Sequence, residues 1–375
     1  MTENTTHTLI TGFPSSLLAV CTLRNVLRKE KHTRVVCVVH EKFRARAQAI
    51  LAELDKSDRQ RVEVLEGDTV SMDLGLSGKE FRTLSETVNV IHHCAAVTYL
   101  GVDRRIAEQV NVGGTREVLE LAESAQNLVR FVHWSSALVS GARRGFVLEE
   151  ELEQSGFRNA IEETRFRAER LVRAAAKRLP TTILRPSITV GDSSTGEIDR
   201  FEGPYLLIQL MLSSPGDLRM PLPDRGNIPL HLVPIDYVVD AGCTIARDPR
   251  SIGKTFHLVD PKPLTAKRVF EIIATEAGRP LPRGSLPTTL TAALLRTPGL
   301  DRFTSLPRAF LEQLGTEVAY DARNTNELLA DTGITCPPFE SYARIMVASV
   351  RQRQAEKKAR DLEEVYDAYD DPLEV

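Results

Sequence analysis

Short apolar runs alternate with longer amphipathic segments along the first half of the chain. The runs are rich in β-branched residues and are predicted as strands at His7–Ile10, Val35–Val39, Val62–Leu65, Val88–His92, Phe131–Trp134 and Thr182–Leu184. Apolar residues recur at helical spacing between them, most clearly over Arg105–Ala125 and Glu162–Lys177. This alternation is typical of an α/β fold with a Rossmann-like, doubly wound parallel sheet.

The pattern loosens after Arg185-Pro186 into stretches rich in Gly, Pro and Ser, which predict loops over a cleft. We expect a dinucleotide-binding-type domain over residues 1–190. A smaller C-terminal substrate-type lobe, interleaved with the core, is expected over 191–350, and a charged helix or tail over 351–375. Within the lobe we predict a strand at Thr255–Val259 and a helix at Thr265–Ala277. The Leu- and Pro-rich segment Leu281–Leu314 either packs on the core or roofs an apolar pocket.

Composition narrows the classes of function. The chain has 375 residues, of which 42% are hydrophobic and 26% charged, and the formal net charge of -3 argues against general affinity for nucleic acid. No apolar run is long enough to span a bilayer. Five scattered cysteines without a C-x-x-C pair predict reduced thiols and a cytoplasmic protein. His92, His93 and His133 have no zinc-like spacing to cysteine, so we expect no metal site.

The first predicted strand leads into T-G-F-P-S-S-L-L-A, a candidate dinucleotide-binding loop. Gly12 supplies the tight turn, and Ser15 could donate to a phosphate at the following helix N-terminus. Leu18 stands where such loops need a small residue, and would push the helix outward or fill the diphosphate space. We therefore expect dinucleotide binding to be weak or lost.

A basic cluster follows the second predicted strand. His40, Lys42 and Arg44 stand where dinucleotide-binding folds hold the adenosine ribose, and their charge favours the 2'-phosphate of NADP. An exposed basic helix start is an equally good interpretation.

Later motifs resemble the extended short-chain dehydrogenase/reductases. These are V-L-E-G-D-T ending at Asp68-Thr69, H-H-C-A-A-V with Ala95 and Ala96, N-V-G-G-T from Asn111, and S-S-A-L-V-S-G with Ser136. The run from Arg185 to Tyr205 is similar to the fatty acyl-CoA and thioester reductase branch, the male-sterility-type group. The resemblance extends to about residue 350.

The resemblance implies an NADPH-dependent reductase of acyl thioesters. It assigns cofactor contacts to Gly12, Ser15, Leu18, His40, Lys42, Arg44, Asp68, Thr69, Ala95, Ala96, Asn111, Arg165, Pro186 and Ile188. Ser136 would orient the substrate carbonyl, although a hydroxyl after a strand can equally cap a neighbouring helix.

One departure from the family concerns the chemistry itself. The family's active-site helix carries Tyr-x-x-x-Lys, and N-A-I-E-E-T-R places Ile161 and Arg165 at these positions. Ile161 has no proton to donate, and a guanidinium hardly deprotonates. Tyr99, after the fourth predicted strand, could supply a hydroxyl or form an aromatic wall.

Three hypotheses follow. The chain is a pseudoenzyme of the reductase fold that binds a partner or metabolite, an active NADP(H)-dependent oxidoreductase with an atypical site, or an assembly subunit of an acyl-handling complex. A protein partner could dock on the apolar roof or on the acidic tail with Tyr366, Tyr369 and Leu373, which otherwise predicts a solvated helix. An acyl ligand and a homodimer through the helices after the fourth and fifth strands are further expectations.

Overall fold

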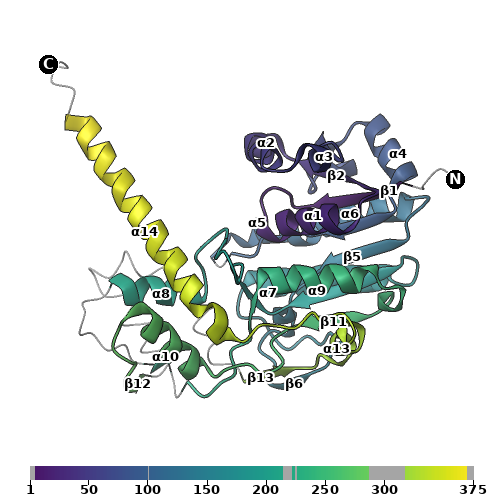
Figure 1. Cartoon of the computed structure of the whole chain (residues 1–375). Helices are drawn as coiled ribbons and strands as arrows, with labels where there is room; N and C mark the ends of the chain where they lie inside the picture. Colours follow the sequence, from purple (N-terminus) through teal and green to yellow (C-terminus); the bar gives the residue numbers. More distant parts are fainter. Residues whose placement is uncertain (1–4, 100, 214–221, 224–225, 287–316, 370–375) are drawn as a thin grey trace. The chain divides into compact units, whose positions relative to one another are not determined.

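The computed structural model describes residues 5–99, 101–213, 222–223, 226–286 and 317–369 (Figure 1). The chain forms two compact units. The first consists of Met1–Val190, His231–Pro263 and Thr316–Pro337, and the second of Gly191–Leu230, Leu264–Gly315 and Pro338–Val375.

A seven-stranded parallel sheet forms the centre of the first unit. Its strands are β1 (Thr6–Thr11), β2 (Thr33–Val39), β3 (Val62–Glu66), β4 (Val90–His93), β5 (Arg130–Trp134), β7 (Thr181–Pro186) and β11 (Thr255–Leu258), in the order β11-β7-β5-β4-β1-β2-β3. All six neighbouring pairs are parallel. The predicted doubly wound α/β fold is confirmed, and each predicted strand lies within one of these seven or overlaps it.

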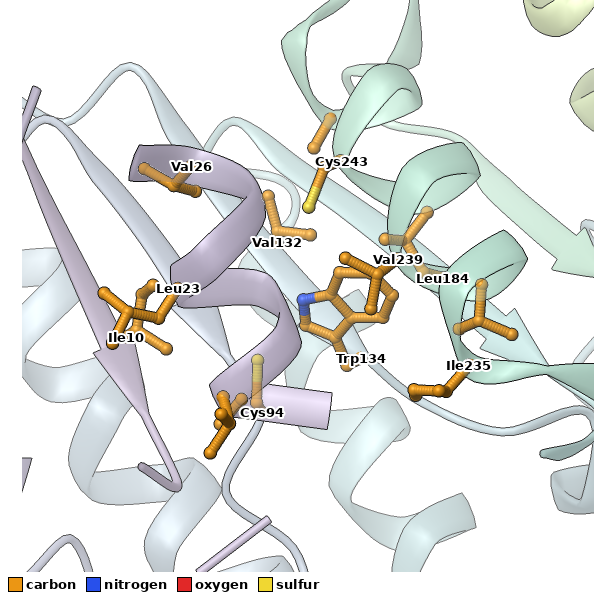
Figure 2. Close-up of a cluster of buried hydrophobic side chains, with 14 of the residues drawn as sticks. Ile10, Leu23, Val26, Cys94, Val132, Trp134, Leu184, Ile235, Val239 and Cys243 are labelled. Atoms are coloured by element: carbon orange, nitrogen blue, oxygen red, sulfur yellow. The ribbon is translucent and has the colours of Figure 1, made fainter. Parts of the chain in front are cut away.

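Helices cover both faces of this sheet because its buried strands present apolar side chains alternately to each side. One face packs on α1 (Leu17–Lys29) and α9 (Ile235–Arg247), and the other on α4 (Gly78–Thr87), α6 (Gly114–Ser124) and α7 (Ala160–Ala175). Trp134 faces α9, where it lies among Leu184, Ile235 and Val239 (Figure 2). A Cβ on Gly242 would lie 2.4 Å from the indole, so glycine lets α9 approach the sheet here.

Other elements of this unit are short. They are the α-helices α2 (Arg44–Ala52), α3 (Lys56–Arg59) and α13 (Arg323–Leu329), and the 3-10 turns η1 (Glu41–Phe43), η2 (Met72–Gly75), η4 (Ala137–Ser140) and η5 (Pro249–Ser251). Two parallel strand pairs, β6 (Gly145–Val147) with β13 (Val318–Tyr320) and β8 (Ile188–Val190) with β10 (Leu232–Pro234), join segments distant in sequence.

The predicted continuous helix Arg105–Ala125 is wrong in its middle. The segment forms α5 (Arg104–Ala107), a π-helical stretch η3 (Glu108–Gly113) and then α6. The spacing of apolar residues cannot reveal a single wide turn, because the apolar residues of α6 continue on the same helix face as those of α5. The turn contains Asn111, whose amide donates to the Val97 carbonyl (3.1 Å) and the Thr164 hydroxyl (2.9 Å) and accepts from the Val97 N–H (2.8 Å).

The second unit contains α8 (Pro204–Ser213), α10 (Ala266–Ala277), α14 (Phe339–Tyr369) and the strand pair β9 (Leu222–Pro223) with β12 (Ser285–Leu286). The first turns of α14 bury Phe339, Tyr342, Met346 and Val350, and the helix packs on α8 and α10. Most of the predicted roof Leu281–Leu314 lies outside the described residues. Within the described part of the chain, no helix is both long and apolar enough to cross a membrane.

A buried charge cluster holds α7 to the sheet. The carboxylate of Glu169, fully buried, accepts from the Arg185 guanidinium (2.6 and 2.9 Å), Arg173 (2.8 Å) and the Ser135 hydroxyl (2.6 Å). Arg185 also donates to the main-chain carbonyls of Glu149 and Glu151. Burial alone would raise the pKa of Glu169, but the two cations and these hydrogen bonds outweigh it and lower the pKa to about 2.

This cluster predicts acid-dependent stability. Because the pKa of Glu169 is lower in the folded chain, its contribution is present above about pH 4.5 and is lost as the pH falls towards 2. We expect Glu169→Gln to lower the free energy of unfolding by about 3 kcal/mol at neutral pH. Urea unfolding at several pH values should show the difference from wild type shrinking in acid.

Glu53→Gln is the matched control, because its carboxylate pairs with Arg24 at the surface. We expect a change below about 1 kcal/mol. If the difference in unfolding free energy between wild type and Glu169→Gln stays constant from neutral pH to pH 3, the assigned charge state of Glu169 is wrong.

Candidate functional site

The carboxyl ends of the central strands meet at one edge of the sheet, where open α/β sheets bind ligands. Gly12 follows β1, Ala95 follows β4, Ser136 follows β5, and Pro186 ends β7. The structure therefore brings together four residues that the sequence assigned to one site.

The turn after β1 lies directly against the segment after β4. Gly12 has φ +87°, and a Cβ there would lie 2.8 Å from the Ala95 nitrogen. The exposed Ser15 donates its hydroxyl to the Gly12 carbonyl (3.0 Å), so it closes this turn. Glycine at position 12 is required both by the backbone conformation and by the close approach of Ala95.

Helix α1 presents its N-terminus at this edge. Its N-cap residue, Ser16, is extended and makes no side-chain cap, so the amides of the first turn are not capped by that hydroxyl. Such an N-terminus suits a phosphate. Leu18 is half-buried and packs against the apolar cluster beneath α1. Whether Leu18 pushes the helix outward or fills the diphosphate space stays a prediction.

A neutral histidine links the carboxyl end of β1 to η3 and α6. His93 Nε2 lies 3.0 Å from the Thr115 hydroxyl, which donates to the Asn111 carbonyl (2.6 Å) and so accepts from the imidazole. His93 Nδ1 then accepts from the Thr11 hydroxyl (2.9 Å), which in turn accepts from the Ala95 N–H (3.2 Å). Burial lowers the pKa of His93 well below 6.5, which keeps this arrangement uncharged. The sequence predicted only that His93 is not a metal ligand, and it could not identify these hydrogen-bond partners.

The basic cluster lies at the carboxyl ends of β2 and β3. His40 caps η1, because its Nδ1 accepts from the Lys42 N–H (3.2 Å), and its Nε2 lies 3.9 Å from an Asp68 carboxylate oxygen. Arg44 pairs with Glu66 (3.4 Å). The half-buried Asp68 accepts from the Val70 N–H (3.2 Å), and Thr69 is also half-buried. His40, Lys42, Arg44 and Asp68 thus lie at the same edge of the sheet. His40 is also the N-cap of a helical turn, as the alternative interpretation of an exposed basic helix start predicted.

Ile161 and Arg165 belong to the buried face of α7. Ile161 is 6% exposed and Arg165 8% exposed. The Arg165 guanidinium donates to the carbonyls of Trp134 and Ser135, each at 2.7 Å. Burial lowers the pKa of Arg165 to about 10, so it stays charged near neutral pH. Its Nη2 therefore binds the main chain at the carboxyl end of β5.

Ser136 follows β5 and is half-buried. Its oxygen accepts from the Leu138 N–H (3.2 Å), which makes it the N-cap of η4, and its hydroxyl donates to the Pro186 carbonyl (3.5 Å). Ser136 therefore caps a helical turn, which is one of the two roles that the sequence allowed. Its predicted role toward a substrate carbonyl is compatible with its place at the edge and stays a prediction.

Two tyrosines are candidates for a hydroxyl that could replace the family's proton donor. Tyr99 is half-buried in the loop after β4. Tyr320, which sequence reasoning missed because β13 is distant in the chain, has its hydroxyl 3.2 Å from that of Ser140. Burial raises the pKa of Tyr320, the opposite of the activation that a catalytic acid needs.

Several predictions fall outside what the structure describes or tests. Leu373 and the side chains of Tyr366 and Tyr369 lie outside the described residues, so tail docking stays a prediction. So does a homodimer through the helices after β4 and β5. Ile188 lies half-buried on β8, and Ala96 follows Ala95 at the edge.

Comparisons with known proteins agree with this geometry. A family model described as male sterility protein matches residues 10–242. The fatty acyl-CoA reductase wat of Drosophila melanogaster is 30% identical over 245 residues, and the glycine betaine reductase ATRR of Emericella nidulans is 29% identical over 222. Each match covers 58% of this chain but only 47% and 17%, respectively, of the relative.

Among solved structures, the terminal R domain from the myxalamid PKS-NRPS biosynthetic pathway has a TM-score of 0.80 and 26% identity. The match covers 94% of this chain and 92% of that domain. The chain is therefore similar to the whole of a reductase domain but spans about half or less of these two curated relatives.

The Gly12 geometry predicts a graded effect of two glycine substitutions. Gly101 has nearly the same φ, +86°, but no atom within 4 Å of an added Cβ. Gly101→Ala should therefore cost only the conformational strain, about 1–2 kcal/mol. Gly12→Ala adds the collision with Ala95 and should cost about 1–3 kcal/mol more. Chemical denaturation of both variants checks this; equal losses would refute the close packing of Gly12.

Proposed function

Because the chain belongs to the male sterility protein family, within the extended short-chain dehydrogenase/reductases related to fatty acyl-CoA and thioester reductases, we propose that it is a reductase-fold binding protein without reductase activity. It binds a dinucleotide of the NADP type weakly and uses the fold to recognise a metabolite or a protein partner.

One observation carries this proposal. Ile161, which the resemblance assigns to the position of the family's proton donor, is buried, and the cation at position 165 is bonded to the main chain at Trp134 and Ser135. In the family, the tyrosine protonates the developing oxyanion while the lysine lowers its pKa and holds the ribose. Neither task is compatible with an alkyl side chain and a guanidinium bonded to two carbonyls.

The cofactor part of the proposal rests on features that fit a dinucleotide. The turn at Gly12 and the N-terminus of α1 suit the diphosphate, and Lys42 and Arg44 are exposed where a 2'-phosphate would lie. A bound reduced nicotinamide would supply hydride. The residues of this chain would hold and orient the cofactor, with Ala95 and Ala96 forming the small-residue turn that leaves room for it.

We expect a measurable preference for NADPH over NADH. Titration can be followed by energy transfer from Trp134, the single tryptophan. The double substitution Lys42→Ala with Arg44→Ala removes two cations, each able to make a charge-assisted contact, and should weaken NADPH about tenfold or more while leaving NADH unchanged. Lys56→Ala, an exposed lysine of α3, is the matched control. Equal loss of both nucleotides would contradict a 2'-phosphate site.

A second function remains supported by a specific observation. Ser136, half-buried at the sheet edge, keeps a hydroxyl where the family orients a carbonyl, and the relatives above are named as reductases. On this alternative the chain reduces an acyl thioester or related carbonyl, with Ser136 as the remaining donor. Because the site would then have one hydroxyl and no general acid with an adjusted pKa, its rate would be about 10² to 10⁴ lower than with such an acid.

Restoring the family pair separates the two functions. We expect wild-type protein to show no NADPH oxidation that depends on palmitoyl-CoA or hexanoyl-CoA. Ile161→Tyr with Arg165→Lys should gain such oxidation, on the order of 10² above background, because it restores a proton donor and its cation. Absorbance of NADPH measures the rate.

The control is Ile161→Phe with Arg165→Lys, which differs from the restored pair by one hydroxyl. Both double variants should bind NADPH equally, and only the tyrosine variant should turn over. Wild-type turnover would overturn the pseudoenzyme proposal in favour of the atypical reductase. Equal rates in the two double variants would exclude the tyrosine hydroxyl as the missing group.

A further inference from the structure

A small cavity lies between the sheet and α7, beneath the segment after β4. It has a volume of ≈ 10 Å³ and is lined by residues that include Ala95, Asn111, Thr115, His133, Arg165 and Ala168. This volume suits a single particle the size of a water molecule. A polyatomic ligand such as phosphate, sulfate or a carboxylate does not fit.

Two of the lining side chains carry a buried nitrogen with no protein partner. Arg165 Nε and His133 Nδ1 make no hydrogen bond within the described part of the chain. The two residues are 8% and 5% exposed and come from different elements, α7 and β5. A buried polar group without a partner is costly, and more so on a cation, so the Arg165 Nε–H indicates a bound acceptor. The neutral His133 can donate to the same acceptor in its Nδ1–H tautomer.

The charges around the cavity indicate whether the bound acceptor is a neutral water or an anion. Glu169 is the carboxylate that favours the charged form of Arg165, but its oxygens are bonded to Arg185, Arg173 and Ser135. Three cations therefore share one carboxylate. Glu149, a second buried carboxylate, accepts instead from the N–H groups of His257, Asn324 and Thr325. A neutral water would satisfy the two nitrogens and leave this excess of positive charge unchanged.

We infer that this cavity is a binding site for one monatomic anion, a chloride ion, held by Arg165 Nε and His133 Nδ1. The anion would accept an N–H from each side chain and offset the charge that Glu169 leaves uncompensated. The cavity shares Ala95, Ala96, Asn111 and Arg165 with the residues that the family resemblance assigns to the cofactor, so it adjoins the proposed cofactor site. The charge argument holds whether or not the chain is a reductase.

Halide-dependent stability tests the site. Thermal unfolding of the full chain is compared in sodium chloride, sodium bromide and sodium gluconate at equal ionic strength, because gluconate is too large for the cavity. We expect a saturable rise in Tm of about 2–4 °C with either halide and no such rise with gluconate. Arg165→Met should abolish the halide dependence. Arg167→Met, on the same helix in a surface pair with Glu108, should retain it.

A direct readout covers the case in which Arg165→Met fails to fold. Wild-type crystals grown in bromide should show an anomalous peak in the cavity beside Arg165 and His133. A halide-independent Tm together with no anomalous peak there would overturn the proposal and assign the cavity to water. An anomalous peak without saturable stabilisation would mean binding at crystal concentration only, and would equally overturn it.

Discussion

The ion cluster around Glu169 is the interaction on which the rest of the site depends. It joins α7 to β5 through Ser135, to β7 through Arg185, and to the segment before α7 through the carbonyls of Glu149 and Glu151. Breaking a buried pair leaves an uncompensated charge, so the cluster is stable only when complete. It fixes the position of α7 without using residues 161 or 165. The position of the helix therefore does not depend on which residues stand at positions 161 and 165.

Arginine and lysine would make different contacts at position 165. A lysine presents one compact charge at the end of a flexible chain, whereas a guanidinium presents a planar fork. Here one guanidinium nitrogen, Nη2, donates to the carbonyls of both Trp134 and Ser135. The positive charge is retained but is bonded to the protein. Burial lowers the pKa of His133 to about 3; Glu169 opposes this shift, and Arg165 and Arg185 add to it. The layer between sheet and helices therefore holds neutral imidazoles beside a fixed cation.

Much of the architecture could be predicted because it follows from local patterns. The parallel sheet appears in the sequence as short β-branched runs, each long enough to be buried on both faces. Three-residue strands such as β6 and β13 carry no comparable pattern, since their pairing depends on segments far apart in the chain. The π-helical turn at Asn111 was also missed, because a single wide turn leaves the apolar stripe of the flanking helices intact.

The sequence by itself determined the fold class and the edge of the sheet where a ligand would bind, and it predicted which residues stand at the family's catalytic positions. These follow from order along the chain and from side-chain chemistry. Only the tertiary structure decided what those side chains contact: Ser136 caps η4, Ser15 closes the Gly12 turn, and Arg165 binds two carbonyls. A hydroxyl or a guanidinium has several compatible partners, and the choice among them depends on which backbone groups the packed sheet and helices leave within about 3 Å.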